Sequence, residues 1–124
     1  MYASMHAFSF IMRAWMNGCV HTQVLFANQT PGDIILRDEL DGMVQAFPTR
    51  VKVWHTVERF SGTAEAEAWS YSTGRICARL LADHLPAPGP AAFVGMCGPR
   101  AMVEEACLPC LKQMGFPESS LFVF

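Results

Sequence analysis

The chain has 124 residues, of which 52% are apolar and 16% are charged, a balance that favours a single folded domain over a disordered or coiled-coil chain. Its formal net charge is −2, and no run of Lys or Arg could neutralise successive phosphates, so we expect no nucleic-acid partner. Five unevenly spaced cysteines argue against a secreted disulfide framework and for a reducing, cytoplasmic location. No segment is apolar enough to predict a membrane span.

The chain is predicted to open with an amphipathic helix. Apolar residues recur there at steps of three and four, the spacing of one helix face, at Met5, Phe8, Met12, Trp15 and Met16. This helix is expected to end near Asn17-Gly18, because glycine commonly follows the last helical residue.

A buried strand and a capped helix are predicted next. Residues 24–27 form an apolar run between polar neighbours, which is typical of a strand covered on both faces. Thr30, Pro31 and Asp33 follow as a helix-start signature, because a hydroxyl, a proline and an acid each suit the first helical turn. The predicted helix ends at Pro48.

Alternating polarity predicts a strand over residues 51–57, and the connection over 61–73 shows no clear periodicity and is predicted to be a loop. The remaining predicted elements are a helix over 76–84, a strand over 92–96, a helix over 102–114 that ends at Gly115, and a strand over 121–124.

This alternation predicts an α/β fold, a three-layer parallel sheet with right-handed crossovers and helices on both faces. In such a sheet, ligands bind outside the carboxyl ends of the strands, where helix N-termini present free N–H groups. Three corners of the chain are therefore expected at one edge: residues 28–30, Glu58, and residues 97–99.

Two residues at this edge are candidates for chemistry. A carboxylate at a strand end, such as Glu58, can accept hydrogen bonds from both hydroxyls of a ribose, but an exposed glutamate paired with Arg59 is the alternative. Gly98 and Pro99 place Cys97 at a strand-to-helix corner, where its thiol either faces a pocket or simply packs.

Other motifs give weaker signals. Cys107 and Cys110 have the C-x-x-C spacing of redox and zinc sites, but they lie on an apolar helical stripe and are interpreted as core, with a thiol redox module as the alternative. Asn28-Gln29-Thr30 matches a glycosylation sequon and is interpreted as a strand-to-helix corner. The four histidines lack ligand spacing, so no metal site is predicted, and no G-x-G-x-x-G loop is present.

Seven ordered motifs run through the chain from about residue 22 onward: LFANQT at 25–30, DIILR at 33–37, WSY at 69–71, DHLP at 83–86, MCGP at 96–99, ACLP at 106–109 and FVF at 122–124. Together they resemble the C-terminal, pyridine-nucleotide half of the cytochrome b5 reductase family, which includes the flavin region of nitrate reductase. The resemblance implies a ferredoxin reductase-like fold in a flavoprotein oxidoreductase. Such a protein passes a hydride from NADH to FAD, and electrons then leave to a haem protein such as cytochrome b5.

The resemblance also implies roles at the nicotinamide end of the ligand. Cys97 would lie beside the nicotinamide as the catalytic residue that helps to place it. Gly98 and Pro99 would shape that pocket, and Met102 would contact the cofactor.

At the adenosine end, Gln29 and Thr30 would lie near the nucleotide, and Glu58 would occupy the acidic ribose position. Arg75 stands where NADH-using members commonly carry an aromatic residue, and its guanidinium could pair with a 2′-phosphate. NADH is therefore the expected cofactor, with NADPH as the alternative.

The chain departs from the family pattern at its amino end. We expect residues 1–124 to be a pyridine-nucleotide-binding domain that lacks the flavin-binding barrel, the first central strand and the glycine-rich loop. The neighbours of that strand would have unpaired backbone groups or be forced together. FAD would then be held by a domain in trans or by missing sequence; the alternative is a non-catalytic truncated paralogue with only a nucleotide-binding or protein-contact surface.

Overall fold

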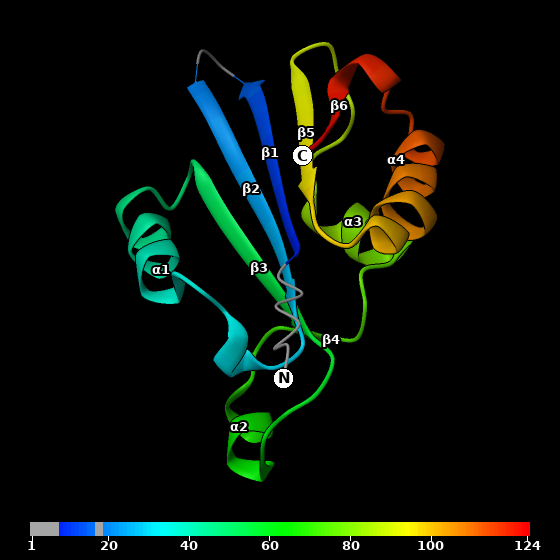
Figure 1. Ribbon diagram of the computed structural model, residues 1–124. Helices are drawn as coiled ribbons and strands as arrows, with labels where there is room; N and C mark the ends of the chain where they lie inside the picture. The colour runs from blue at the N-terminus through cyan, green and yellow to red at the C-terminus, as the bar shows by residue number, and fades with distance from the viewer. Residues whose placement is uncertain (1–7, 17–18) are drawn as a thin grey trace.

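The computed structural model describes the backbone of residues 8–16 and 19–124 and the side chains from Val20 onward. Within these residues one six-stranded sheet is flanked by helices (Figure 1). The strands are β1 (Phe8–Met16), β2 (Cys19–Asn28), β3 (Val51–Val57), β4 (Ser72–Thr73), β5 (Ala92–Cys97) and β6 (Leu121–Val123). The helices are η1 (Pro31–Asp33), α1 (Arg37–Ala46), α2 (Thr63–Ala68), α3 (Ala78–His84), η2 (Met102–Cys107), α4 (Leu108–Met114) and η3 (Glu118–Ser120).

The strands follow the order β4-β3-β2-β1-β5-β6. Parallel pairs join β2 to β3, β3 to β4, and β5 to β6. Helix α1 packs against β3 on one side of the sheet, and α3 and α4 pack together on the other (Figure 1). The predicted α/β class, with parallel strands and helices on both faces, is therefore confirmed.

The predicted opening helix is wrong, because residues Phe8–Met16 form strand β1. This strand pairs antiparallel with β2 along its whole length and with β5 over residues 9–14. Ladder hydrogen bonds on both edges satisfy the backbone groups of β1, and this pairing overrides the helical spacing of its apolar residues. Met5, the first residue of the predicted helix, lies outside the described residues.

Strand β1 fills the position where we expected the sheet to lack a central strand. It lies between β2 and β5, so the facing edges of these two strands are neither unpaired nor forced together. The expectation that these neighbours would have unpaired backbone groups or be forced together is therefore wrong. Because β1 is antiparallel to both neighbours, the sheet is mixed at its centre rather than wholly parallel.

Two connections also differ from the sequence predictions. The predicted helix after Thr30 is divided into η1 and α1, and Leu36 between them adopts a left-handed backbone with φ 55°. The predicted loop over residues 61–73 contains the short helix α2 and strand β4. Aromatic side chains order this segment: the Nε1 atoms of Trp54 and Trp69 donate hydrogen bonds to Oγ and O of Ser72, at 2.8 and 2.9 Å.

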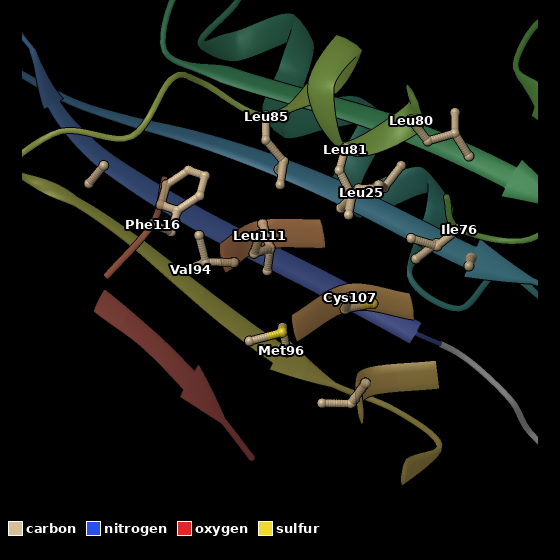
Figure 2. Packing of buried hydrophobic residues seen from close by; sticks show 13 residues of the cluster. Leu25, Ile76, Leu80, Leu81, Leu85, Val94, Met96, Cys107, Leu111 and Phe116 are labelled. Carbon is tan, nitrogen blue, oxygen red and sulfur yellow. The ribbon is translucent and has the colours of Figure 1, made fainter. Parts of the chain in front are cut away.

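The hydrophobic core lies between the sheet and the α3/α4 pair (Figure 2). Leucines of α3 face residues of β2 and β5 across this layer, and the helix over 102–114 closes it. Each of these elements contributes a side chain that is 0% exposed: Leu25 from β2, Leu81 from α3, Met96 from β5 and Leu111 from α4.

Helices η2 and α4 form one continuous helical segment that begins immediately after Pro99. Its first part is π-helical, which we attribute to Pro109, because proline lacks an N–H and its ring clashes with the carbonyl one turn earlier. The helix ends where predicted, at Gly115, whose φ of 105° suits a residue without a Cβ atom.

Candidate functional site

A cleft of about 410 Å³ opens at the carboxyl ends of the parallel strands. Three strand-end segments and the start of the helix over 102–114 form its walls. The lining residues are Ala27, Asn28, Gln29, Glu58, Gly74, Arg75, Ile76, Pro99, Ala101, Met102, Glu105 and Ala106. This is the edge at which the sequence predicted a ligand site.

Five of the eight predicted site residues line this cleft: Gln29, Glu58, Arg75, Pro99 and Met102. They come from four separate parts of the chain, so the topology brings them together. Their proposed contacts with a cofactor stay predictions.

The other three predicted residues lie outside the lining. Cys97 ends β5 with an exposed side chain, and Gly98 forms the bend that leads to Pro99 at the cleft wall. The polar groups of Thr30 form local hydrogen bonds instead: its hydroxyl and its backbone N–H both donate to the Asp33 carboxylate, at 2.8 and 3.1 Å. Thr30 therefore acts as the predicted helix cap.

Backbone hydrogen bonds hold the ends of β2 and β3 together under the cleft. The N–H of Glu58 donates to the carbonyls of Asn28 and Gln29, at 3.2 and 3.1 Å, and the N–H of Arg59 donates to the Gln29 carbonyl at 2.9 Å. Glu58 and Gln29 are thus presented from a fixed backbone. This rigidity favours a binding site because less conformational freedom is lost when a ligand binds.

An ion pair stands on one wall of the cleft. Arg75 Nε donates to Glu58 Oε1 at 3.1 Å. The Glu58 side chain is 36% exposed and the Arg75 side chain 82%, so solvent screens the pair and its net contribution to stability is small. The adjacent Arg59 donates from Nη2 to Gln29 Oε1 at 3.0 Å.

The opposite wall is the N-terminus of the helix over 102–114. The N–H of Val103 donates to the Pro99 carbonyl, at 3.1 Å. The N–H groups of Arg100, Ala101 and Met102 precede this bond, so none of them has an acceptor within the helix. Such a terminus favours an anion or another acceptor in front of it.

Several lining residues were not predicted from the sequence. Ala101, Glu105 and Ala106 lie on the same helical face as Met102, and the helical spacing of three and four residues could have identified them.

Asn28 is 4% exposed, and its Nδ2 atom has no hydrogen-bond partner among the described residues. Because it is buried at the sheet edge, glycosylation of its sequon is disfavoured.

The C-x-x-C motif belongs to the core. Cys107 is fully buried, and burial, with a smaller effect of Cys110, raises its pKa to about 12. A thiol redox module needs an accessible thiol with a lowered pKa, so that alternative is wrong.

Among the described residues, no helix has the length and apolar character needed to cross a membrane.

Comparisons with known proteins agree with this architecture. The family model "Oxidoreductase NAD-binding domain" matches residues 7–108. The chain is 43% identical over 101 residues to NADH-cytochrome b5 reductase 2 of Danio rerio, covering 82% of this chain and 31% of that protein. NADH-cytochrome b5 reductase 1 of Homo sapiens is 40% identical over 101 residues, with coverages of 82% and 32%.

The crystal structure of the cytochrome b5 reductase domain of Ulva prolifera nitrate reductase superposes with a TM-score of 0.72 at 37% identity. The match covers 81% of this chain and 37% of that one. The chain thus spans about a third of the length of the relatives it matches. The family match over most of its residues is direct evidence: the chain belongs to the oxidoreductase NAD-binding domain family.

Proposed function

We propose that residues 1–124 are the pyridine-nucleotide-binding domain of a flavin-dependent electron-transfer oxidoreductase similar to cytochrome b5 reductase. In this function NADH binds at the strand-end cleft and passes a hydride to FAD, and electrons leave to a haem protein such as cytochrome b5. The observation that carries the proposal is the convergence of Gln29, Glu58, Arg75 and Pro99 on one cleft at the carboxyl ends of the strands.

The residues of the cleft fit the adenosine half of such a ligand. Glu58 Oε1 is bound by Arg75, and its second oxygen can accept hydrogen bonds from a ribose hydroxyl. Across the cleft, the free N–H groups before Val103 suit the diphosphate. The volume of about 410 Å³ lies in the range of small-molecule sites.

Cys97, Gly98 and Pro99 would position the nicotinamide. The exposed thiol of Cys97 lies at the end of β5, immediately before the bend that leads into the cleft wall. Bound NADH supplies the hydride and FAD accepts it, so this chain contributes orientation rather than a reacting group. Cys97 would limit where the nicotinamide ring can lie and would exclude water from one side of it.

FAD would be held mainly by a domain outside residues 1–124, either on a separate chain or in additional sequence. The support is that the relatives are about three times as long as the matched region. We also propose a cytoplasmic location. The four cysteines whose side chains are described, Cys77, Cys97, Cys107 and Cys110, are all free, as expected in a reducing compartment.

The second candidate is a non-catalytic paralogue that keeps only a nucleotide-binding or protein-contact surface. The observation that favours it is the centre of the sheet, where β1 runs antiparallel to both neighbours and the sequence has no G-x-G-x-x-G loop. A phosphate-binding loop after a parallel central strand is the usual device of such folds. Without it, nucleotide binding depends on the remaining walls of the cleft.

Calorimetric titration of the 124-residue chain with NADH tests the proposal, with circular dichroism confirming that each protein is folded. Replacing Glu58 with Ala should weaken binding roughly tenfold, because a charge-assisted acceptor for ribose hydroxyls is lost. Glu67→Ala is the matched control, since Glu67 is exposed on α2 and does not line the cleft. A folded wild-type chain that does not bind NADH would contradict the proposal.

A second variant tests the nicotinamide end. Cys97→Ala should weaken the binding of NADH but not of ADP-ribose, which lacks the nicotinamide. If the variant weakened the binding of NADH and of ADP-ribose equally, Cys97 would not act at the nicotinamide. The paralogue reading instead predicts that hydride transfer stays absent when an FAD-loaded flavin domain of a relative is added in trans, even where NADH binds.

A further inference from the structure

In the ion pair between Arg75 and Glu58, each side chain engages only one of its hydrogen-bonding atoms. Arg75 contacts Glu58 through Nε, and this is the one side-chain bond between Arg75 and the residues the structure describes. A guanidinium carries five N–H donors on two edges, so the edge formed by its terminal nitrogens is available. Among the residues that the structure describes, Glu58 likewise engages Oε1 alone, so Oε2 can act as an acceptor.

A second guanidinium lies beside this pair. Arg59 follows Glu58 directly and is held by Gln29, which lines the same cleft. Arg59 does not itself line the cleft, so Arg75 is the cation on this wall and Arg59 is a second cation held behind it by Gln29. The other carboxylate of the cleft, Glu105, belongs to the helical wall. The region around Glu58 is thus locally positive although the whole chain carries a formal charge of −2.

We propose that this wall accepts a 2′-phosphorylated adenosine as well as the unphosphorylated one, so that the cleft takes both NADPH and NADH. The proposal rests on the nucleotide-binding function proposed above. With NADH, Glu58 Oε2 accepts a ribose hydroxyl. With NADPH, the free edge of Arg75 binds the 2′-phosphate while its Nε stays on Glu58.

Glu58 does not exclude the phosphate, because Arg75 lies between the two anions. A phosphate monoester carries close to two negative charges at neutral pH, and beside a lone carboxylate it would be repelled. Here Arg75 neutralises Glu58 and donates to the phosphate at the same time, while Arg59 adds a second positive charge nearby. Arg75 is thus a specificity-determining residue, and Arg59 supports it.

The test compares two probes that differ by the 2′-phosphate alone, 2′,5′-ADP and 5′-AMP, in calorimetric titrations of the full chain at low salt. Wild-type protein should bind 2′,5′-ADP at least as tightly as 5′-AMP. Arg75→Gln should weaken the binding of 2′,5′-ADP roughly tenfold more than it weakens the binding of 5′-AMP. Arg79→Gln is the matched control, because Arg79 is exposed on α3, pairs with Asp83 and does not line the cleft.

The outcomes separate this inference from the proposed function. A chain that binds 5′-AMP and NADH but binds 2′,5′-ADP much more weakly overturns the inference and leaves the function intact. Equal losses of both probes in Arg75→Gln, or the same loss in Arg79→Gln, also overturn it, because the 2′-phosphate would then not be read by Arg75. A folded chain that binds none of these nucleotides removes the function and the inference together.

Discussion

The two faces of the sheet differ in how they are covered. Strand β5 shows this within a few residues: Val94 and Met96 are fully buried against α3 and α4, whereas Phe93 is 48% exposed on the α1 side. A continuous apolar core fills the α3/α4 face (Figure 2). On the other face, β3 is the element that α1 mainly contacts. None of the α1 side chains is buried, and all are partly or fully exposed.

The α1 face also contains a fully buried polar side chain. His55 is fully buried on β3, and neither of its ring nitrogens has a hydrogen-bond partner among the described residues. Its ring instead lies against Phe26 and Tyr71, with centroids 6.1 and 5.0 Å away. We therefore expect the α3/α4 face to contribute most of the free energy of unfolding and the α1 face to contribute little.

The largest contrast is expected in thiol reactivity. With a pKa of about 12, the fraction of Cys107 present as thiolate near pH 8 is about a thousandfold lower than for a thiol with the ordinary pKa of 9.0. The Cys107 side chain is also inaccessible to solvent. Cys97, exposed at the end of β5, should therefore react with iodoacetamide well before Cys107. Peptide mapping by mass spectrometry measures both rates, and similar rates would mean that the core face opens readily.

Stability provides the next contrast. Met96→Ala should lower the free energy of unfolding by about 3 kcal/mol, because it leaves a cavity in a fully packed core. Met43→Ala on α1 is the matched control: Met43 is 49% exposed, and its loss should cost less than about 1 kcal/mol. Urea denaturation monitored by circular dichroism gives both values, and equal costs would contradict the difference between the faces.

His55 should limit stability on the α1 face. Burial, followed by the charge of Arg37, lowers its pKa below 6.5, while Asp41 acts in the opposite direction. The unfolded chain therefore binds a proton at a higher pH than the folded chain does. Stability is highest above about pH 6.5 and falls as the pH drops toward the folded pKa.

Replacing His55 with Phe should raise the free energy of unfolding by about 1 to 2 kcal/mol and flatten this pH dependence, because two unpaired buried nitrogens are removed. Burial also lowers the pKa of His84, so this residue contributes a pH dependence of the same sign, which remains in the His55→Phe variant. Urea denaturation at several pH values between about 5 and 8 gives the free energy of unfolding of the wild type and of the variant at each pH. An unchanged pH slope would show that His55 is not the responsible group.

The sequence predicted most elements of the core face because their signals are local. Alternation identified β3, helical spacing identified α3, and Gly115 identified the end of α4. The convergence of Glu58 and Pro99 on one edge followed from the strand-end rule for α/β sheets.

Strand β1 was missed because two signals in the sequence compete. Apolar residues are so frequent over Phe8–Met16 that they fit helical spacing as well as a strand. Asn17-Gly18 suits the end of a helix, but the same dipeptide is a strong hairpin signal, and Met16 pairs with Cys19. Long-range pairing with β5 decides the conformation, and a local pattern cannot contain it. The Arg75 to Glu58 bond likewise depends on a side-chain approach across 17 positions.

The smallest effect is expected at the exposed end of the α1 face. Phe93 contacts Phe122 at a centroid distance of 6.2 Å, and both rings are about half exposed. Phe93→Thr keeps a residue that favours strands, so the ladder with β1 should persist and the free energy of unfolding should change by less than about 1 kcal/mol. The same urea experiment measures it. A cost near that of Met96→Ala would mean that this half of the face is packed, and the two faces would then differ in polarity rather than in packing.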